Sequence, residues 1–334
     1  MRLICSALAL TAVTVTAHAH HSGAFYDLGK QITIEGTVAR YDWANPHVYI
    51  YVAQTVDDGR VIEWEVETFP PGVMRRQGWS PDTLRAGDRI VVSGNPARNV
   101  ANTSLYPTLI RRGGRTLYEQ MAGFQRLATA SAADEAVAKG LNGTWATLLT
   151  LDVVMRFAQP ELPLTDAGAA ALASFDYRTM DPEIDCVPNA APLFMIDPDI
   201  KRISTANGVM MIAAGWSERT IHMDVASHDG ASPSVQGHST GRWEGSTLVI
   251  DTTHFADHRT GNAYVGVPSG SMKHLVERLA LDEGGTSLTY SFELTDPEFL
   301  AAPVSGRVQW SHRPDLNFER HECDLETARR FIAE

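Results

Sequence analysis

Apolar and polar positions alternate in short stretches along the first 116 residues, and this alternation predicts half-buried β-strands. The stretches fall at residues 31–38, 47–52, 61–66, 89–94 and 104–111. The second and third are separated by the turn residues Asp57-Asp58-Gly59, which indicates a hairpin. A short helix is expected over residues 71–79. Five strands with a helix between the third and fourth is the order of an OB-type barrel.

The same alternation returns in the last two hundred residues. Here strands are expected at residues 208–212, 220–224, 247–252, 275–281, 287–294, 304–312 and 317–323, most of them joined by short turns. Gly143-Thr144-Trp145 marks an earlier strand that resembles the start of a lipocalin, and Thr165 is a candidate N-cap of a short helix. The pattern predicts an antiparallel meander closed into a lipocalin-like barrel, of a size that can hold one small ligand. The fold class is therefore all-β.

Changes in composition divide the chain into four parts. Residues 1–19 are expected to be a leader, 20–116 the OB-like domain, 117–140 an alanine-rich linker and 141–334 the second barrel. In the leader, Arg2 precedes an apolar run that is shorter than the roughly 20 residues a bilayer span needs. Ala17-His18-Ala19 has the small residues of a signal-peptidase site. These features predict a periplasmic or secreted protein without a membrane span.

The net charge and the cysteine content indicate which partners and which compartment suit this protein. The formal charge is −12, and loss of Arg2 with the leader would give −12 − 1 = −13. Such an acidic surface repels phosphate backbones, so nucleic acid is excluded as a partner. Cys186 and Cys323 remain after the leader is removed, and export to an oxidising compartment predicts a disulfide between them. Two buried free thiols are the alternative.

Cleavage after Ala19 would make His20 the first residue of the mature chain. Its α-amine and imidazole, with His21 and with His47 from a later turn, form a candidate metal site. Amine and imidazole nitrogens suit copper or zinc, so a copper ion, or less favourably zinc, is the expected cofactor. A solvated histidine tail is the alternative interpretation.

Motifs in both parts of the chain resemble exported domains of unknown function. The first part has the following motifs: His20-His21-Ser22, Gly36-Thr37-Val38, Trp43-x-Asn45-Pro46-His47, Trp64-Glu65, Gly78-Trp79 and Leu84-x-x-Gly87-Asp88. Together they resemble the DUF6152 family, which implies an OB-like fold but no activity. The second part, with Gly237-His238-Ser239-x-Gly241-Arg242-Trp243-Glu244-Gly245, resembles another recurrent exported β-rich domain.

Polar residues on the strands of the second barrel form a candidate catalytic group. His238, Asp251, His274 and Glu277 combine imidazoles with carboxylates, the residue types used for general acid–base catalysis. A structural role, with Glu277 in an ion pair, is the alternative. Ser239 does not lie in a strand–turn–helix context, so a serine hydrolase of the nucleophile-elbow type is rejected.

Three hypotheses about function follow from the sequence. The first is an exported binding protein that holds a metal ion, and a small apolar ligand in the second barrel. The second is an enzyme, a hydrolase, lyase or isomerase, acting on a small hydrophobic molecule in that barrel. The third is an interaction protein of the cell envelope.

Overall fold

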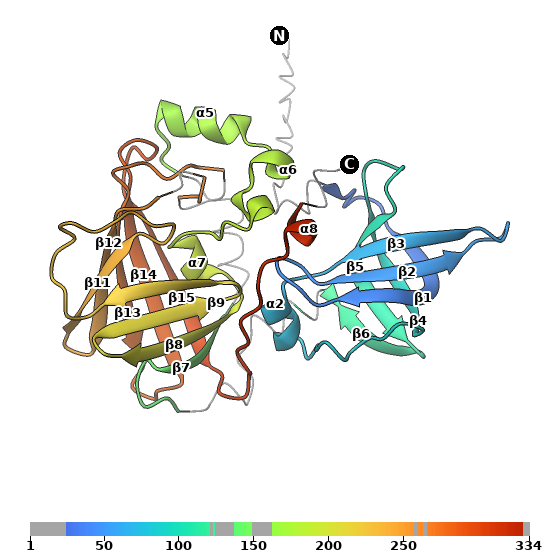
Figure 1. Cartoon of the computed structure of the whole chain (residues 1–334), viewed down its shortest axis with the longest axis horizontal. Coiled ribbons are helices and arrows are strands. Elements are labelled where there is room, and N and C mark those ends of the chain that lie inside the picture. The colour runs from blue at the N-terminus through green and yellow to red at the C-terminus, as the bar shows by residue number, and fades with distance from the viewer. Residues whose placement is uncertain are drawn as a thin grey trace, which may run out of the picture.

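A computed structural model describes residues 25–120, 123, 137–148, 162–256, 259–262 and 266–329. Two β-barrels stand side by side, and the C-terminal segment passes between them (Figure 1). The first body contains β1 Ile32–Asp42, β2 Tyr49–Thr55, β3 Val61–Glu67, α2 Pro71–Arg76, β4 Arg89–Pro96, β5 Ser104–Arg112 and β6 Arg115–Glu119. The second contains β7 Gly143–Thr147, α5 Asp166–Ser174, α6 Tyr177–Met180, η2 Pro182–Asp185, α7 Leu193–Ile196, β8 Ile200–Ala206, β9 Val209–Ala214, β10 Ser217–His222, β11 His238–Glu244, β12 Thr247–Thr253, β13 His274–Leu281, β14 Ser287–Thr295 and β15 Val304–His312. The short helix α8 Leu325–Ala328 follows.

The predicted five-stranded barrel is present in the N-terminal body. Its sheet has the order β3-β2-β1-β4-β5-β6, and a parallel pairing of β3 with β5 closes β1 to β5 into a barrel. The inward positions of the alternating strands supply its core, for example Ile34 and Val38 of β1, which are 2% and 1% exposed. The hairpin at Gly113-Gly114, where both glycines have positive φ, adds β6 to the sheet edge. The sheet therefore continues past residue 116, into the segment expected to be a linker.

The C-terminal body is a closed barrel of nine strands, in the order β10-β11-β12-β13-β14-β15-β7-β8-β9. The strands pair antiparallel except for β10 and β11, which are parallel. An odd number of strands cannot alternate in direction all the way round a closed barrel, so one parallel pair is required. The chain must then cross from the end of β10 back to the start of β11. Residues 223–237 make this crossover, and the site described below is built at it.

Large side chains fill the interior of this barrel. Trp145, Tyr290 and Trp310 are each 0% exposed, and Tyr290 stacks on Trp310 with 5.9 Å between ring centroids. Beside them the guanidinium of Arg219 pairs with the carboxylate of Glu277, and both side chains are fully buried. The predicted binding of a small apolar ligand inside the barrel stays a prediction.

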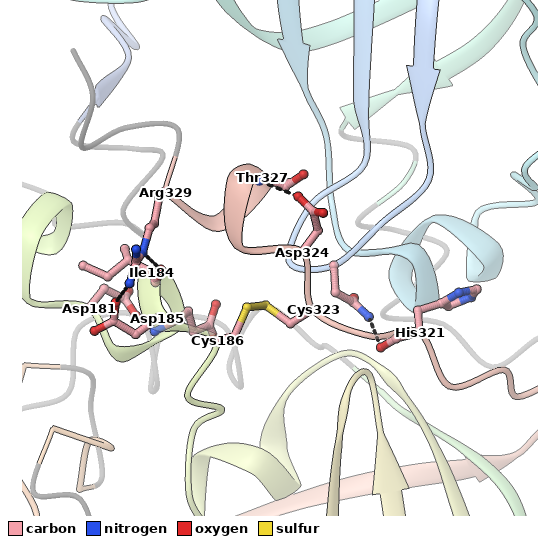
Figure 2. Close-up of a disulfide and its surroundings, with 11 residues drawn as sticks. Asp181, Ile184, Asp185, Cys186, His321, Cys323, Asp324, Thr327 and Arg329 are labelled. Atoms are coloured by element: carbon pink, nitrogen blue, oxygen red, sulfur yellow. Dashed lines mark hydrogen bonds and ion pairs between the residues drawn. A yellow bond between two sulfur atoms is a disulfide. The ribbon is translucent and has the colours of Figure 1, made fainter.

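The expected disulfide joins Cys186 to Cys323, with a sulfur–sulfur distance of 1.98 Å. Figure 2 shows it linking the turn after η2 to the C-terminal segment. The prediction of a last barrel strand at residues 317–323 was wrong, because this segment leaves the barrel after β15. It is held instead by the first body: the Asn45 side-chain amide donates to the His321 carbonyl at 3.1 Å, and Asn45 forms an isolated bridge with Cys323.

Helix α2 docks the first barrel on the second. Arg76 donates to the carbonyl oxygens of Pro198 and Thr147, at 2.5 and 2.6 Å. Gly72 lies so close to Asp199 that an added Cβ would be 1.5 Å from the carboxylate oxygen. A residue without a side chain is therefore required at this contact. Among the helices of the described ranges, none has the length and hydropathy to cross a bilayer.

Candidate metal centre on the second barrel

Four neighbouring strands, β10 to β13, present histidine and aspartate side chains on the outer face of the second barrel. Ser239 and Thr252 point inward, because their hydroxyls accept hydrogen bonds from buried Arg219 at 3.0 and 2.7 Å. Successive side chains of a strand point to opposite faces. His238 and Asp251, which precede these two residues, therefore point outward.

The alternation of side chains along a strand places two more histidines on this outer face. Ile221 and Leu275 are core residues with no exposure, so their neighbours His222 and His274 point outward. The crossover from β10 to β11 then brings His228 over the face. The strand register and the crossover together collect histidines that are up to 52 residues apart in the sequence (274 − 222 = 52).

Asp251 is bound on both of its carboxylate oxygens by imidazoles. His228 Nε2 lies 2.9 Å from one oxygen and His274 Nε2 lies 3.0 Å from the other. On its far side the ring of His228 meets His238, with 2.8 Å between the two Nδ1 atoms. A continuous chain of hydrogen bonds thus runs from His274 through Asp251 and His228 to His238.

Four of the imidazole rings lie near one another on this face. His238 lies 4.9 Å from His222 and 5.0 Å from His228, measured between ring centroids. His254 lies 6.1 Å from His228 and 6.5 Å from His238. We call His222, His228, His238 and His254 the imidazole cluster.

His254 has an unusual backbone for a residue with a side chain. Its φ of 59° is in the left-handed region, which costs a non-glycine residue about 1–2 kcal/mol. Hydrogen bonds to Ser234 fix this conformation. The backbone N–H of Ser234 donates to the His254 carbonyl, and the Ser234 carbonyl accepts from the backbone N–H of Ala256. The ring is anchored too, because His254 Nδ1 lies 2.8 Å from the hydroxyl of Thr253. Strain of this kind, held by neighbouring contacts, is commonly found at functional sites.

The surroundings favour a neutral His238 and an ionised Asp251. Partial burial lowers the pKa of His238, and the neighbouring His222, His228 and His254 lower it further. Partial burial alone would raise the pKa of Asp251, but the hydrogen bonds from His274 and His228 outweigh this and bring the pKa below its ordinary value. A neutral imidazole is the form that binds a metal ion.

The site is accessible from solvent. The side chains of His228, Asp251 and His274 are 19%, 29% and 42% exposed. Within the residues that the structure describes, no three His, Cys, Asp or Glu side chains are already arranged around a common point as metal ligands. In the cluster, the two Nδ1 atoms of His228 and His238 contact each other directly at 2.8 Å.

Of the predicted catalytic residues, the structure brings three together and separates the fourth. His238, Asp251 and His274 belong to the one hydrogen-bonded chain, with His228 as the link. Glu277 lies on the same strand as His274 but points into the barrel, where it pairs with Arg219 and accepts a hydrogen bond from Tyr290 at 2.9 Å. Its 0% exposure gives it the structural role that was the alternative for this residue.

The predicted metal ligands are only partly within the described residues. His20 and His21 lie outside them. His47 is nearly buried, with its Nδ1 2.9 Å from a Glu67 oxygen and 2.8 Å from the Thr68 carbonyl. Burial lowers the pKa of His47, but the Glu67 carboxylate and the hydrogen bonds outweigh it and raise the pKa above its ordinary value.

His222 and His228 were not among the residues predicted from the sequence. One signal for them was present: six of the twelve histidines lie between residues 222 and 274. No regular spacing connects these histidines, because the residues come from strand ends and from a crossover loop.

Comparison with known proteins finds a match to a family model in the N-terminal part of the chain. Residues 8–106 match the family model described as "Family of unknown function (DUF6152)". This agrees with the resemblance found in the motifs, and the match ends before the second barrel begins. No curated protein matches the chain.

Among solved structures, a match is found to "Crystal structure of a putative aspartyl-tRNA synthetase from Leishmania major Friedlin". The identity is 9% and the TM-score 0.19, with 87% of this chain covered. The chain spans about half, 51%, of that structure. At this TM-score the match carries no argument about fold or function.

Proposed function

We propose that this protein is an exported transition-metal-binding protein whose metal centre is the imidazole cluster on the second barrel. The observation that carries the proposal is the pair of Nδ1 atoms of His228 and His238, which face each other at 2.8 Å in front of the Asp251 carboxylate. Export is supported by the predicted leader and by the disulfide, since disulfides persist in oxidising compartments.

A small movement would admit an ion between these two rings. Zinc–nitrogen bonds are about 2.0–2.1 Å long in tetrahedral sites, which puts two ligand nitrogens about 3.3 Å apart. The rings would therefore separate by about 0.5 Å from their present contact, exchanging one hydrogen bond for two metal–nitrogen bonds. His222 and His254, whose ring centroids lie 4.9 and 6.5 Å from that of His238, would supply the remaining nitrogens.

The donor set selects the class of ion. Imidazole nitrogens suit copper, zinc, iron and nickel, whereas magnesium and calcium prefer oxygen ligands. Copper binds most tightly among the divalent first-row ions, so copper or zinc is the expected occupant. The surrounding arrangement also suits a metal, because metal-bound histidines commonly donate their second N–H to a carboxylate, as His228 does to Asp251.

Metal titration of the full mature chain tests the proposal. The chelator-treated protein is titrated with Co²⁺ and Zn²⁺ and monitored by visible absorption and calorimetry. Wild type is expected to bind one ion at the cluster, with the absorption of a nitrogen-ligated cobalt centre, and the variant His228→Ala/His238→Ala is expected to lose it. His321→Ala removes an imidazole of similar exposure outside the cluster and should bind as wild type does. Unchanged binding in the double variant would refute the proposal.

A second candidate is the N-terminal copper site of His20, His21 and His47. One observation favours it: the hydroxyl of Tyr26 and Nδ1 of His47 contact the two oxygens of the same Glu67 carboxylate, at 3.0 and 2.9 Å. The chain is thus anchored beside His47 five residues after His21 (26 − 21 = 5), a reach of at most about 17 Å. Because Nδ1 contacts Glu67 and Thr68, the ligand atom of His47 would be Nε2.

Two measurements test this candidate. Intact mass of the exported protein identifies the first residue, and a copper titration counts the ions in wild type and in His47→Ala. A mature chain that begins at His20 and loses one copper ion on His47→Ala supports the site. A chain that begins elsewhere removes the amine ligand and the candidate with it.

A further inference from the structure

We infer that Asp251 is a positioning residue that sets the tautomer of His228 and thereby makes Nδ1 of His228 the atom that binds the metal ion. The inference deepens the proposed function and rests on it for the metal itself. It assigns different roles to residues of one hydrogen-bonded chain: His228 is a ligand, whereas Asp251 and His274 act from outside the ligand set.

Asp251 requires one hydrogen from each of its two imidazole partners. An ionised carboxylate has acceptors only, so each imidazole nitrogen facing it must carry a hydrogen. Nε2 of His228 and Nε2 of His274, at 2.9 and 3.0 Å, are therefore the protonated nitrogens. A neutral imidazole has one N–H, so Nδ1 of His228 is left with its lone pair.

That lone pair points at His238. In the contact between the two Nδ1 atoms, the hydrogen then belongs to His238, which donates to His228. An arriving ion displaces this hydrogen: Nδ1 of His238 gives up its proton to solvent while Nε2 takes one up, so the ring stays neutral and both Nδ1 atoms become ligands. Nδ1 of His228 needs no change of protonation, because Asp251 already holds the ring in its binding form.

His274 holds the carboxylate in place for this task. Its N–H occupies the second oxygen of Asp251, so the first oxygen is aimed at His228. His274 is also the most exposed of these side chains, at 42%, and it comes from β13, beyond the strand that carries Asp251. Its place on the far side of the carboxylate makes it an outer partner and not a ligand.

The substitution Asp251→Asn would separate the positioning role of Asp251 from a role in packing. Asn has nearly the same shape as Asp but offers one acceptor oxygen and one NH₂ donor. It cannot accept from both histidines: when its oxygen accepts from His274, its NH₂ faces Nε2 of His228. Nε2 must then carry the lone pair, and the hydrogen moves to Nδ1, where it blocks the metal.

The test uses the full mature chain of wild type, Asp251→Asn and Asp251→Glu. Asp229→Asn is the matched control, because it removes the same charge from the exposed crossover that carries His228. The ring ¹⁵N shifts of His228 in the metal-free protein give its tautomer, and competition with a chelator gives the Zn²⁺ affinity. Wild type and Asp229→Asn are expected to have His228 protonated at Nε2. Asp251→Asn is expected to move the hydrogen to Nδ1 and to weaken zinc binding by about 10–100-fold, and Asp251→Glu to restore the Nε2–H tautomer.

The outcomes separate the two proposals. If wild type binds zinc and Asp251→Asn neither changes the tautomer nor weakens binding, the role of Asp251 is refuted and the metal centre stands. If wild type binds no ion at the cluster, the metal centre is refuted, and the shift of tautomer in Asp251→Asn still decides whether Asp251 positions His228. Equal weakening by Asp229→Asn would show that charge alone, not tautomer, is responsible, and would overturn the inference.

Discussion

His228 and His238 face each other through their Nδ1 atoms at 2.8 Å, although one comes from a crossover loop and the other from the strand that follows it. The nine-stranded closure of the barrel explains why they meet. Because β10 and β11 are parallel, the chain must return along the outside of the barrel, and residues 223–237 bring His228 back over the start of β11. The candidate metal centre is thus located at the one place where the antiparallel order of the barrel is interrupted.

Loss of the Glu277 carboxylate is expected to destabilise the second barrel strongly. Glu277→Ala leaves the Arg219 guanidinium buried without its partner, which costs about 3–5 kcal/mol in the free energy of unfolding. Glu244→Ala is the matched control, because its pair with Arg242 is exposed and contributes at most about 1 kcal/mol. Urea unfolding of both variants measures the difference. Equal losses would show that Glu277 is not the structural residue described above.

Lys273 is expected to make stability increase with pH above neutrality. Burial lowers its pKa to about 7 from the ordinary 10.5, and its ammonium contacts Ser269 at 3.1 Å. Between these values the unfolded chain binds a proton that the folded chain does not, so the free energy of unfolding rises with pH, by about 1.4 kcal/mol per pH unit at most.

Lys273→Met should remove this dependence. Unfolding is measured from pH 7 to 10.5, and the exposed Lys30→Met serves as the control that keeps the wild-type slope. A slope that persists in Lys273→Met would assign it to other groups.

Glu67 is expected to hold the pKa of His47 above its ordinary value. Burial by itself lowers the pKa of His47, and the Glu67 carboxylate reverses the shift. Glu67→Gln should therefore bring the pKa of His47 below its ordinary value, as followed by NMR titration of the ring.

The same pair contributes to stability in a defined pH range. Because the folded pKa is raised, the contribution is complete below the unfolded pKa of about 6.5 and is lost as pH rises through the folded value. Wild type and Glu67→Gln should therefore differ most in acid. A difference that grows with pH would contradict the pairing.

Gly72→Ala is expected to disturb the contact between the two barrels. Its Cβ would lie 1.5 Å from the Asp199 carboxylate, which is packed against α2. Gly284→Ala is the control, because the nearest atom there is 3.7 Å away. Small-angle scattering should show a change in the shape of Gly72→Ala and none in the control. An unchanged profile for Gly72→Ala would mean that the carboxylate can move aside without cost to the docking.

Local pattern was sufficient for much of the fold. Strand alternation is a property of neighbouring residues, so the five strands of the first barrel and most strands of the second could be predicted from it. The disulfide between Cys186 and Cys323 followed from counting cysteines in an exported chain. Residues 317–323 misled the prediction, because they leave the barrel after β15 and are held by Asn45 of the other barrel and not by a neighbouring strand.

The catalytic interpretation of His238, Asp251 and His274 stays a prediction, as does the small apolar ligand. What the structure adds is their connection through His228, together with His222, and the sequence grouped neither of these two histidines with them.

The sequence by itself determined which residues form strands and which chemistry-bearing side chains those strands carry. It could not determine which side chains face outward together, because that depends on register and barrel closure between segments far apart in the chain. Asp251 and Glu277 demonstrate the difference: both are carboxylates on adjacent strands, yet one points out toward two imidazoles and the other points in toward Arg219. The alternation of side chains along a strand is local. Which of the two faces of the strand belongs to the core and which to solvent is decided only when the barrel closes.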